Sequence, residues 1–281
     1  MEGWHCFLGN SKITGDPRLP LLDHIGQQHA WQFLLSHKRM SSEAFDDTDW
    51  EAVGQGLRSS TLAFRLWAAK HVSRFCGTGR MMALMGEWDT DCCPCCHLEW
   101  EDTFHLPLCP HPDMVTKFDS ELAQLQAKLE DLDTSPILLN AITSYVRPRG
   151  DRPFSAGLPN PQDTDLAWQD AHTWHHFMEG KFSKVLGDYQ AEYYRSISSR
   201  RSASRWTSRL SKYLLMFLHN MWKCRNTFVH PIVDGGLSPE AYAVLQEDIN
   251  TQLHLGTTRL PRNDHYLFKE TLTSLNENSI A

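Results

Sequence analysis

The sequence contains no run of eighteen or more apolar residues, and it does not begin with a basic segment followed by an apolar stretch and small residues. The first absence argues against a membrane-spanning helix, and the second against export by a signal peptide. Gly77 and Gly79 are not followed by Gly-Lys-Ser/Thr, and no Gly-x-Ser-x-Gly sequence is present. Because the sequence shows neither a membrane-spanning run nor a signal peptide, we expect an intracellular protein, nuclear or cytoplasmic, with no membrane partner.

The carboxylate pair of a nucleotide polymerase is also missing. No Tyr-x-Asp-Asp or other close acidic pair follows a strand-like run, so two-metal nucleotide addition lacks its residues.

Alternating strand patterns are lacking as well, and no internal repeat is visible. Instead, apolar residues recur at helical spacing, most clearly in Asp113–Leu132. The sequence predicts a mainly α-helical protein.

Caps and breakers place the other expected helices. Thr48 is a candidate N-cap for a helix over Asp49–Leu57, after a polar break at 41–48. An apolar stripe from Trp206 to Met221 predicts a long helix with one buried side. Further helices are expected at Leu19–Met40, Ser59–Phe75, Arg80–Trp88, Ile137–Val146, Leu166–Met178 and from Pro239 to about Leu255.

Five of the eight cysteines lie within eighteen residues, Cys92 to Cys109. Taken as Cys93-x2-Cys96-x8-His105-x3-Cys109, this stretch supplies four ligands at a spacing typical of a structural, tetrahedral Zn²⁺ site. Such a site has every position filled by protein and stabilises the fold without activating water. We expect a CCHC zinc knuckle within residues 92–111.

The ligand register is not unique. Cys92 and Cys95 have the same spacing as the preferred pair, and His97 or His111 could replace His105. Three acidic residues between the ligand pairs, Glu99, Glu101 and Asp102, could support the imidazole or simply face water. Disulfides are not favoured, because the remaining cysteines are scattered.

These residues carry a family resemblance. The run Cys93-Pro94-Cys95-Cys96, then Glu101-Asp102-Thr103, then His105 and Cys109-Pro110, resembles the zinc-binding region at the C-terminal end of LINE-type retroelement reverse transcriptases. That family has roughly CPxC, an acidic pair, His and Cys. Here His97 follows the second ligand where the family usually has glycine. The resemblance covers about residues 48–230 and implies two kinds of partner, RNA or DNA and the polymerase part of the same element.

We expect two helical parts. Residues 1–47 would form a tail and a helix, residues 48–146 a helical domain with the knuckle, and residues 164–281 a C-terminal helical domain. Prolines concentrated in 147–163 predict a linker between these domains.

Basic residues are segregated although the net charge is −7. Residues 52–86 contain five basic and no acidic residues, and residues 181–225 contain ten basic and two acidic ones. Such segregation is typical of a surface that faces a polyanion. The candidate nucleic-acid-binding residues are Arg58, Arg65, Lys70, Arg74, Arg200, Arg201, Arg205 and Arg209.

Two other functions stay open. A structural zinc could instead support a protein–protein interaction module. Arg225 and His230 match the Arg-polar-x3-His pattern of HEPN-type metal-independent ribonucleases, and this resemblance implies phosphate stabilisation by Arg225 and proton transfer by His230. We favour a non-catalytic protein because a six-residue pattern arises easily by chance.

Overall fold

The computed structural model describes residues 6–8, 11–13, 32–33, 40–98, 100–160, 164–230, 232–233, 236–237 and 239–259. These residues are mostly helical, as predicted. The described strands form two hairpins, β1 (Cys6–Leu8) with β2 (Ser11–Ile13) and β3 (Ile232–Val233) with β4 (Gly236–Leu237). Among the described helices, none combines the length and the apolar character needed to cross a bilayer. The helix predicted at Leu19–Met40 falls almost wholly outside the described residues.

The chain divides into two compact units, Met1–Met221 and Trp222–Ala281. In the first unit the order is α2 (Ser42–Asp47), α3 (Trp50–Arg58), α4 (Leu62–Ser73), α5 (Gly79–Leu84), α6 (Pro112–Glu130), α7 (Pro136–Val146), η1 (Phe154–Gly157), α8 (Thr164–Ala167), η2 (Trp168–Ala171), α9 (Trp174–Met178), α10 (Val185–Ser196) and most of α11 (Ala203–Val229). In the second unit, α12 covers Pro239–Leu255, as predicted, and η3 covers Gly256–Arg259.

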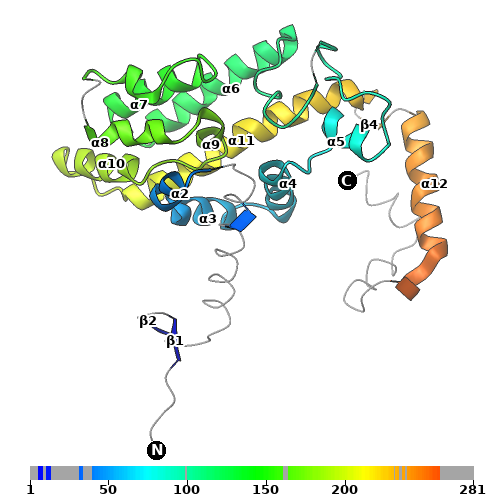
Figure 1. Ribbon diagram of the computed structural model, residues 1–281, viewed down its shortest axis with the longest axis horizontal. Helices are drawn as coiled ribbons and strands as arrows, with labels where there is room; N and C mark the ends of the chain where they lie inside the picture. The colour runs from blue at the N-terminus through cyan, green and yellow to red at the C-terminus, as the bar shows by residue number, and fades with distance from the viewer. Residues whose placement is uncertain are drawn as a thin grey trace, which may run out of the picture. The chain divides into compact units, whose positions relative to one another are not determined.

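Helix α11 is the central element of the first unit, with α6 along one side and α3 and α4 along the other (Figure 1). Phe118 of α6 meets Phe217 edge-on, with ring centroids 5.0 Å apart. Gly56 of α3 packs so closely that an added Cβ would lie 2.8 Å from the Ser208 carbonyl oxygen. The predicted apolar stripe is buried here: Trp206, Leu210, Leu214, Phe217 and Met221 are at most 1% exposed.

Helix α6 forms where its sequence predicts it, because its caps and its stripe agree. Pro112 occupies the first turn, and His111 Nδ1 accepts the Asp113 N–H at 3.3 Å. The buried stripe includes one acid, Glu121, whose carboxylate pairs with Lys117 at 2.7 Å and accepts from Asn220 at 2.8 Å. These two partners compensate for burying the charge.

Three local predictions were wrong. The polar break expected at 41–48 is helix α2, capped by Ser41, whose side chain accepts the Ala44 N–H. Thr48 ends α2 instead of starting α3, because its hydroxyl donates to the Ala44 carbonyl at 2.6 Å while Asp49 caps α3 through the Ala52 N–H. The single helix expected at Leu166–Met178 is divided into α8, η2 and α9, because Thr173 caps a new helix through the His176 N–H.

The structure also divides the chain at a different place from the linker expected at 147–163. Phe154 is fully buried between Tyr145 and Phe177, and the Asn140 side chain donates to the Gly157 carbonyl at 2.8 Å. Prolines exclude regular helix from this segment, but they do not prevent one aromatic ring from packing into the core. The first unit therefore continues through this segment to Met221, within α11.

Candidate metal centre

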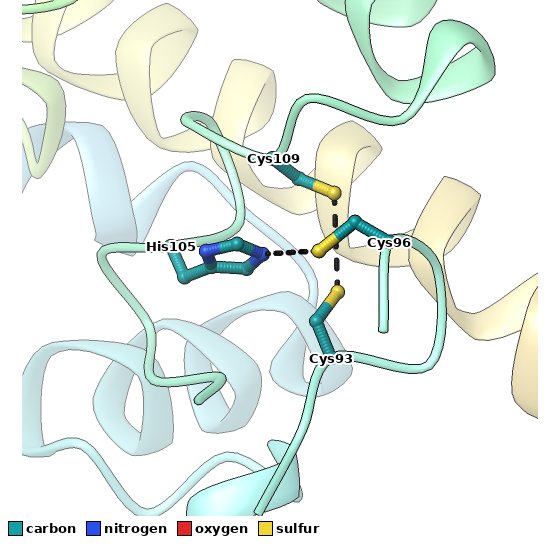
Figure 2. A group of neighbouring side chains, drawn as sticks. All are labelled: Cys93, Cys96, His105 and Cys109. Carbon is teal, nitrogen blue, oxygen red and sulfur yellow. Dashed lines mark hydrogen bonds between the residues drawn. The ribbon is translucent and has the colours of Figure 1, made fainter. Parts of the chain in front are cut away.

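Four side chains from the loop between α5 and α6 converge on one point. The ligand atoms of Cys93, Cys96, His105 and Cys109 all lie within 4.8 Å of one another. Figure 2 shows the three sulfurs and the imidazole pointing toward a common centre, with Cys93 and Cys96 from one turn and His105 and Cys109 from the following segment. The cluster predicted from the sequence is thus brought together in the expected register.

The spacing of these atoms suits a tetrahedral ion. Zn–S bonds of about 2.3 Å at tetrahedral angles place two sulfurs about 3.8 Å apart, and a sulfur and an imidazole nitrogen about 3.6 Å apart. The Cys93 and Cys109 sulfurs are separated by 3.8 Å, and the Cys96 sulfur is 3.4 Å from His105 Nε2. These two separations are close to those of a zinc site, and no two of the four ligand atoms are farther apart than 4.8 Å.

A tight turn presents the first ligand pair. The Cys95 N–H donates to the Cys93 sulfur at 3.4 Å, and the His97 N–H donates to the Cys93 carbonyl at 2.9 Å. His97 adopts φ 57°, in the left-handed region that favours glycine. A histidine therefore occupies a position at which the backbone conformation favours glycine.

Glu101 fixes the knuckle to helix α5. It is fully buried, and its Oε2 accepts the Gly79 N–H at 2.7 Å while its Oε1 lies 3.8 Å from the Cys93 sulfur. Thr78 occupies the N-cap position of α5 but makes no side-chain capping bond, so the Glu101 carboxylate supplies the acceptor from a distant part of the chain. An added Cβ at Gly79 would lie 2.6 Å from the Cys92 carbonyl oxygen, so this contact requires glycine.

The segment that carries the second ligand pair is held by hydrogen bonds between the Asp102 side chain and the backbone, and by one backbone turn. Asp102 Oδ1 accepts the N–H groups of Phe104 and His105 at 2.8 and 2.9 Å, and the Leu108 N–H donates to the His105 carbonyl. Sequence reasoning considered Glu101 and Asp102 as supports for the imidazole or as surface residues. Both accept hydrogen bonds from backbone amides and thereby position the ligand-bearing turns.

The ligands strongly perturb each other's protonation. Hydrogen bonds from Cys93 and Cys95 hold the pKa of the Cys109 thiol far below its ordinary value. Burial lowers the pKa of His105, but hydrogen bonds to Cys109 and Cys93 outweigh burial and raise this pKa to about 11. A metal ion must compete with the protons held here, so metal binding would release protons and weaken as the pH falls.

The alternative ligands lie outside the cluster. Cys92 forms an isolated β-bridge with Trp100, His97 is exposed, and His111 caps α6. Cys95 is buried beside Cys93 and Cys109, which raise the pKa of its thiol, but its sulfur is not among the four that share a centre. The register Cys93/Cys96 is therefore preferred by the geometry.

The candidate nucleic-acid-binding residues of the N-terminal half differ in exposure. Arg58, Arg65 and Lys70 are exposed on α3 and α4. Arg74 is half-buried, and its guanidinium lies 4.2 Å from the centre of the Phe104 ring, next to His105 in the sequence. This contact links the end of α4 to the zinc-ligand loop.

The four arginines of the C-terminal half are brought together. Arg200, Arg201, Arg205 and Arg209 line one cavity of about 650 Å³ where α11 begins. We call this space the arginine cavity. Leu132, Tyr194 and Trp206 lie behind the arginines and are at most 5% exposed, and this neighbourhood was not predicted, because no sequence pattern connects these three separate segments.

Arg225 and His230 differ in their surroundings. The Arg225 side chain is buried, its guanidinium lies 5.1 Å from the centre of the Trp222 ring, and it donates to the Asn226 side chain at 3.3 Å. His230 is exposed at the end of α11. The ribonuclease interpretation requires both side chains to face one phosphate, and this difference in exposure does not favour it.

A buried group superficially resembles a catalytic triad. The Thr48 hydroxyl is 3.1 Å from His172 Nε2, and His172 Nδ1 is 3.9 Å from the Asp47 carboxylate. Thr48 is fully buried and donates to the Ala44 carbonyl, and burial lowers the pKa of His172. With its hydroxyl inaccessible to substrate, this group connects α2 to the segment before α9.

Comparisons of this chain with protein-family models, with curated proteins and with solved structures find no match, so its function has to be argued from the geometry of the CCHC cluster and of the basic surfaces.

Proposed function

We propose that this protein is a non-catalytic zinc-binding module that associates with RNA or DNA, similar to the C-terminal region of LINE-type reverse transcriptases. The observation that carries the zinc assignment is the closed set of ligands. Three cysteines and one histidine fill all four tetrahedral positions, which is typical of a structural Zn²⁺. No position is left for the water that a catalytic zinc would activate.

The role of the ion would be to fix the loop between α5 and α6. Residues 85–111 connect the two helices, the described part of this loop contains no helix or strand, and its turns are held by the four ligands together with Glu101 and Asp102. Through Arg74 and Phe104 the same loop meets the end of α4, which carries Arg65 and Lys70. Zinc binding would therefore order the basic helix as well as its own loop.

The nucleic-acid assignment is supported by the exposed cations of α3, α4 and α11. Lys212 Nζ donates to the Ser59 carbonyl at 3.1 Å, which joins α11 to the end of α3, one position after Arg58 in the sequence. The arginine cavity lies at the beginning of the same helix. Phosphate contacts from such side chains would supply affinity with little sequence specificity.

The test is salt-dependent binding of the zinc-loaded protein to labelled RNA. If four arginines each neutralise one phosphate, the logarithm of the association constant should fall with log[salt] with a slope of about −3 on a single strand. Absence of binding at low salt, or binding with no salt dependence, would contradict the proposal. Cys93→Ser should weaken binding if the ion orders the basic surface.

A protein–protein interaction module is the second candidate, and one observation favours it. Helix α4 exposes two large apolar side chains beside its cations: Leu62 and Leu66 are 61% and 56% exposed, although Phe64 and Trp67 already face the core. If the polymerase part of the same retroelement covers these exposed side chains, Leu66→Lys should abolish that association and leave RNA affinity unchanged.

A further inference from the structure

Exposed apolar side chains are concentrated around the zinc-ligand loop. Thirteen large apolar side chains are exposed in the described part of the chain, and six of them lie within residues 75–108. These six are Phe75, Leu84, Met85, Leu98, Trp100 and Leu108. Arg80 lines one cavity together with Phe75 and Leu84, which are 62% and 73% exposed. The Arg80 guanidinium also lies 4.7 Å from the centre of the Trp100 ring, so part of this apolar set meets around one cation. Grouped apolar side chains with polar neighbours are typical of a binding surface.

The cavity beside α5, which we call the α5 cavity, contains a buried hydroxyl that lacks a partner. Thr103 lines the cavity and is 2% exposed. Its Oγ1 is buried and makes no hydrogen bond to any residue that the structure describes. Burying a hydroxyl without a partner is unfavourable in the free protein, so this group is available to a ligand that offers an acceptor.

The charges of the α5 cavity suit one negative group. Its charged lining residues are Arg74, Arg80 and Asp102, which together carry a net charge of +1. Asp102 Oδ1 already accepts two backbone N–H groups, so this carboxylate is partly occupied. Two guanidinium groups and a free hydroxyl are donors that a carboxylate accepts from directly.

The surroundings do not suit a long polyanion. Three exposed acids, Glu87, Asp89 and Asp91, follow α5 in the sequence. An added Cβ at Gly79 would lie 2.7 Å from the Asp91 carbonyl oxygen, so this acidic segment comes back against the beginning of α5. Like charges of this kind oppose a chain of phosphates, whereas a single carboxylate in direct contact with the arginines is bound.

Size and composition also favour a protein ligand. The volume of the α5 cavity is about 210 Å³, below the range of about 300–1,000 Å³ that is usual for small-molecule sites, so it suits the end of one side chain better than a whole nucleotide. Arginine, phenylalanine, methionine and leucine line it, and lysine does not. Protein–protein interfaces are enriched in arginine, methionine and aromatic residues and depleted in lysine.

We propose that the α5 cavity and the apolar side chains at its edge, Phe75 and Leu84, bind a segment of a partner protein in which one aspartate or glutamate is flanked by large apolar residues. The acidic side chain enters the cavity and accepts hydrogen bonds from Arg74, Arg80 and Thr103. The flanking residues cover the exposed apolar side chains. This site goes beyond the proposed nucleic-acid association and does not depend on it.

The probe is a library of random seven-residue peptides displayed on phage and selected on the zinc-loaded full chain. We expect the selected peptides to share one acidic residue with leucine, phenylalanine or tryptophan beside it. The most enriched peptide is then synthesised, and its affinity is measured by fluorescence anisotropy. Replacing its acid by the corresponding amide should weaken binding by about tenfold or more, because a charged hydrogen-bond partner is lost.

Variants of the protein locate the peptide. Arg80→Gln should lower peptide affinity by about tenfold or more. Arg195→Gln is the matched control and should change affinity less than about twofold, because Arg195 is an exposed cation on α10 that pairs with Glu192 at 3.6 Å. Leu84→Ser should lower affinity by about fivefold, whereas Ile197→Ser, at a 46% exposed apolar side chain after α10, should not.

Thr103→Val distinguishes a ligand contact from a structural role. Valine keeps the shape of threonine and removes the hydroxyl, so peptide affinity should fall by about fivefold. The melting temperature of the free protein should stay the same or rise, because a buried hydroxyl without a partner has been removed. A lower melting temperature with unchanged peptide affinity would show that the hydroxyl serves the fold and would overturn its role in the site.

The possible failures are distinguishable from failure of the proposed function. Selection of peptides without a shared acidic residue, or peptide affinity that is unchanged in Arg80→Gln, would overturn the docking site. Displacement of the peptide by an unstructured ten-nucleotide RNA, with RNA affinity also reduced in Arg80→Gln, would overturn it in favour of a nucleic-acid surface. If the peptide binds as expected and RNA does not bind at low salt, the proposed function fails and the docking site stands.

Discussion

Replacing Glu101 should reveal how strongly the zinc-ligand loop depends on its contact with α5. In Glu101→Ala the Gly79 N–H loses a charged acceptor at 2.7 Å inside the protein. A hydrogen bond to a charged group contributes about 1.5–3 kcal/mol. A carboxylate at a helix N-terminus adds about 0.3–1 kcal/mol, so we expect Glu101→Ala to lower the free energy of unfolding by about 2–4 kcal/mol.

Glu101→Gln separates the acceptor from the charge. The amide oxygen can still accept from Gly79, so this variant should lose only about 1 kcal/mol. The measurement is denaturant unfolding at neutral pH with zinc in excess, followed by tryptophan fluorescence. The reasoning is refuted if the alanine variant is as stable as wild type, or if the glutamine variant is destabilised as much as the alanine variant.

Three further predictions concern other groups of the first unit. Burial lowers the pKa of His71 from 6.5 to about 4, so its neutral form stabilises the fold above pH 6.5, and about 3 kcal/mol of stability is lost as the pH falls from 6.5 to 4. In His71→Phe the free energy of unfolding should fall less steeply than in wild type as the pH is lowered from 6.5 to 4. The same dependence of unfolding free energy on pH in both proteins would contradict this. His97→Gly should raise the unfolding free energy by about 0.5–1 kcal/mol, because relief of the left-handed conformation exceeds the entropy cost of glycine, and a destabilised variant in thermal melts would refute it. Lys181→Met should cost about 3–5 kcal/mol because Glu179, 2.6 Å away, is left charged and buried. The added change Glu179→Leu should restore most of that loss in denaturant unfolding, and no recovery would show that packing, not charge, is responsible.

The helical class and several helices could be predicted because their signals are local. The predicted Asp113–Leu132 and Ile137–Val146 helices correspond to α6 at Pro112–Glu130 and α7 at Pro136–Val146. Each combines a proline at its start with a continuous apolar stripe. The prediction failed at Thr48, because threonine can begin a helix or end one. Here Asp49 caps α3, and the Thr48 hydroxyl donates to the Ala44 carbonyl at the end of α2.

Contacts between distant segments limited the rest of the fold prediction. Segment 147–163 has the composition of a linker, but Phe154 is buried by side chains of α7 and α9. Composition describes what a segment can form by itself, and it carries no information on a pocket that other helices provide. For the same reason, the central place of α11 in the first unit could not be derived from its stripe alone.

The candidate metal site was predictable because four ligands within seventeen residues have few ways to meet one ion. The sequence favoured Cys93 and Cys96 and left Cys92 and Cys95 as an alternative, and the backbone turns the favoured pair toward His105 and Cys109. The buried role of Glu101 had no sequence signal, since its partner Gly79 lies 22 positions earlier.

The most direct test of the central claim is the metal content of protein purified without added zinc, measured by plasma mass spectrometry on wild type, Cys93→Ser and Cys92→Ser. Cys93 belongs to the cluster and Cys92 does not, although they are adjacent. We predict close to one zinc ion per chain in wild type and in Cys92→Ser, and far less in Cys93→Ser. Equal zinc in all three proteins, or none in wild type even after zinc is supplied, would contradict the account.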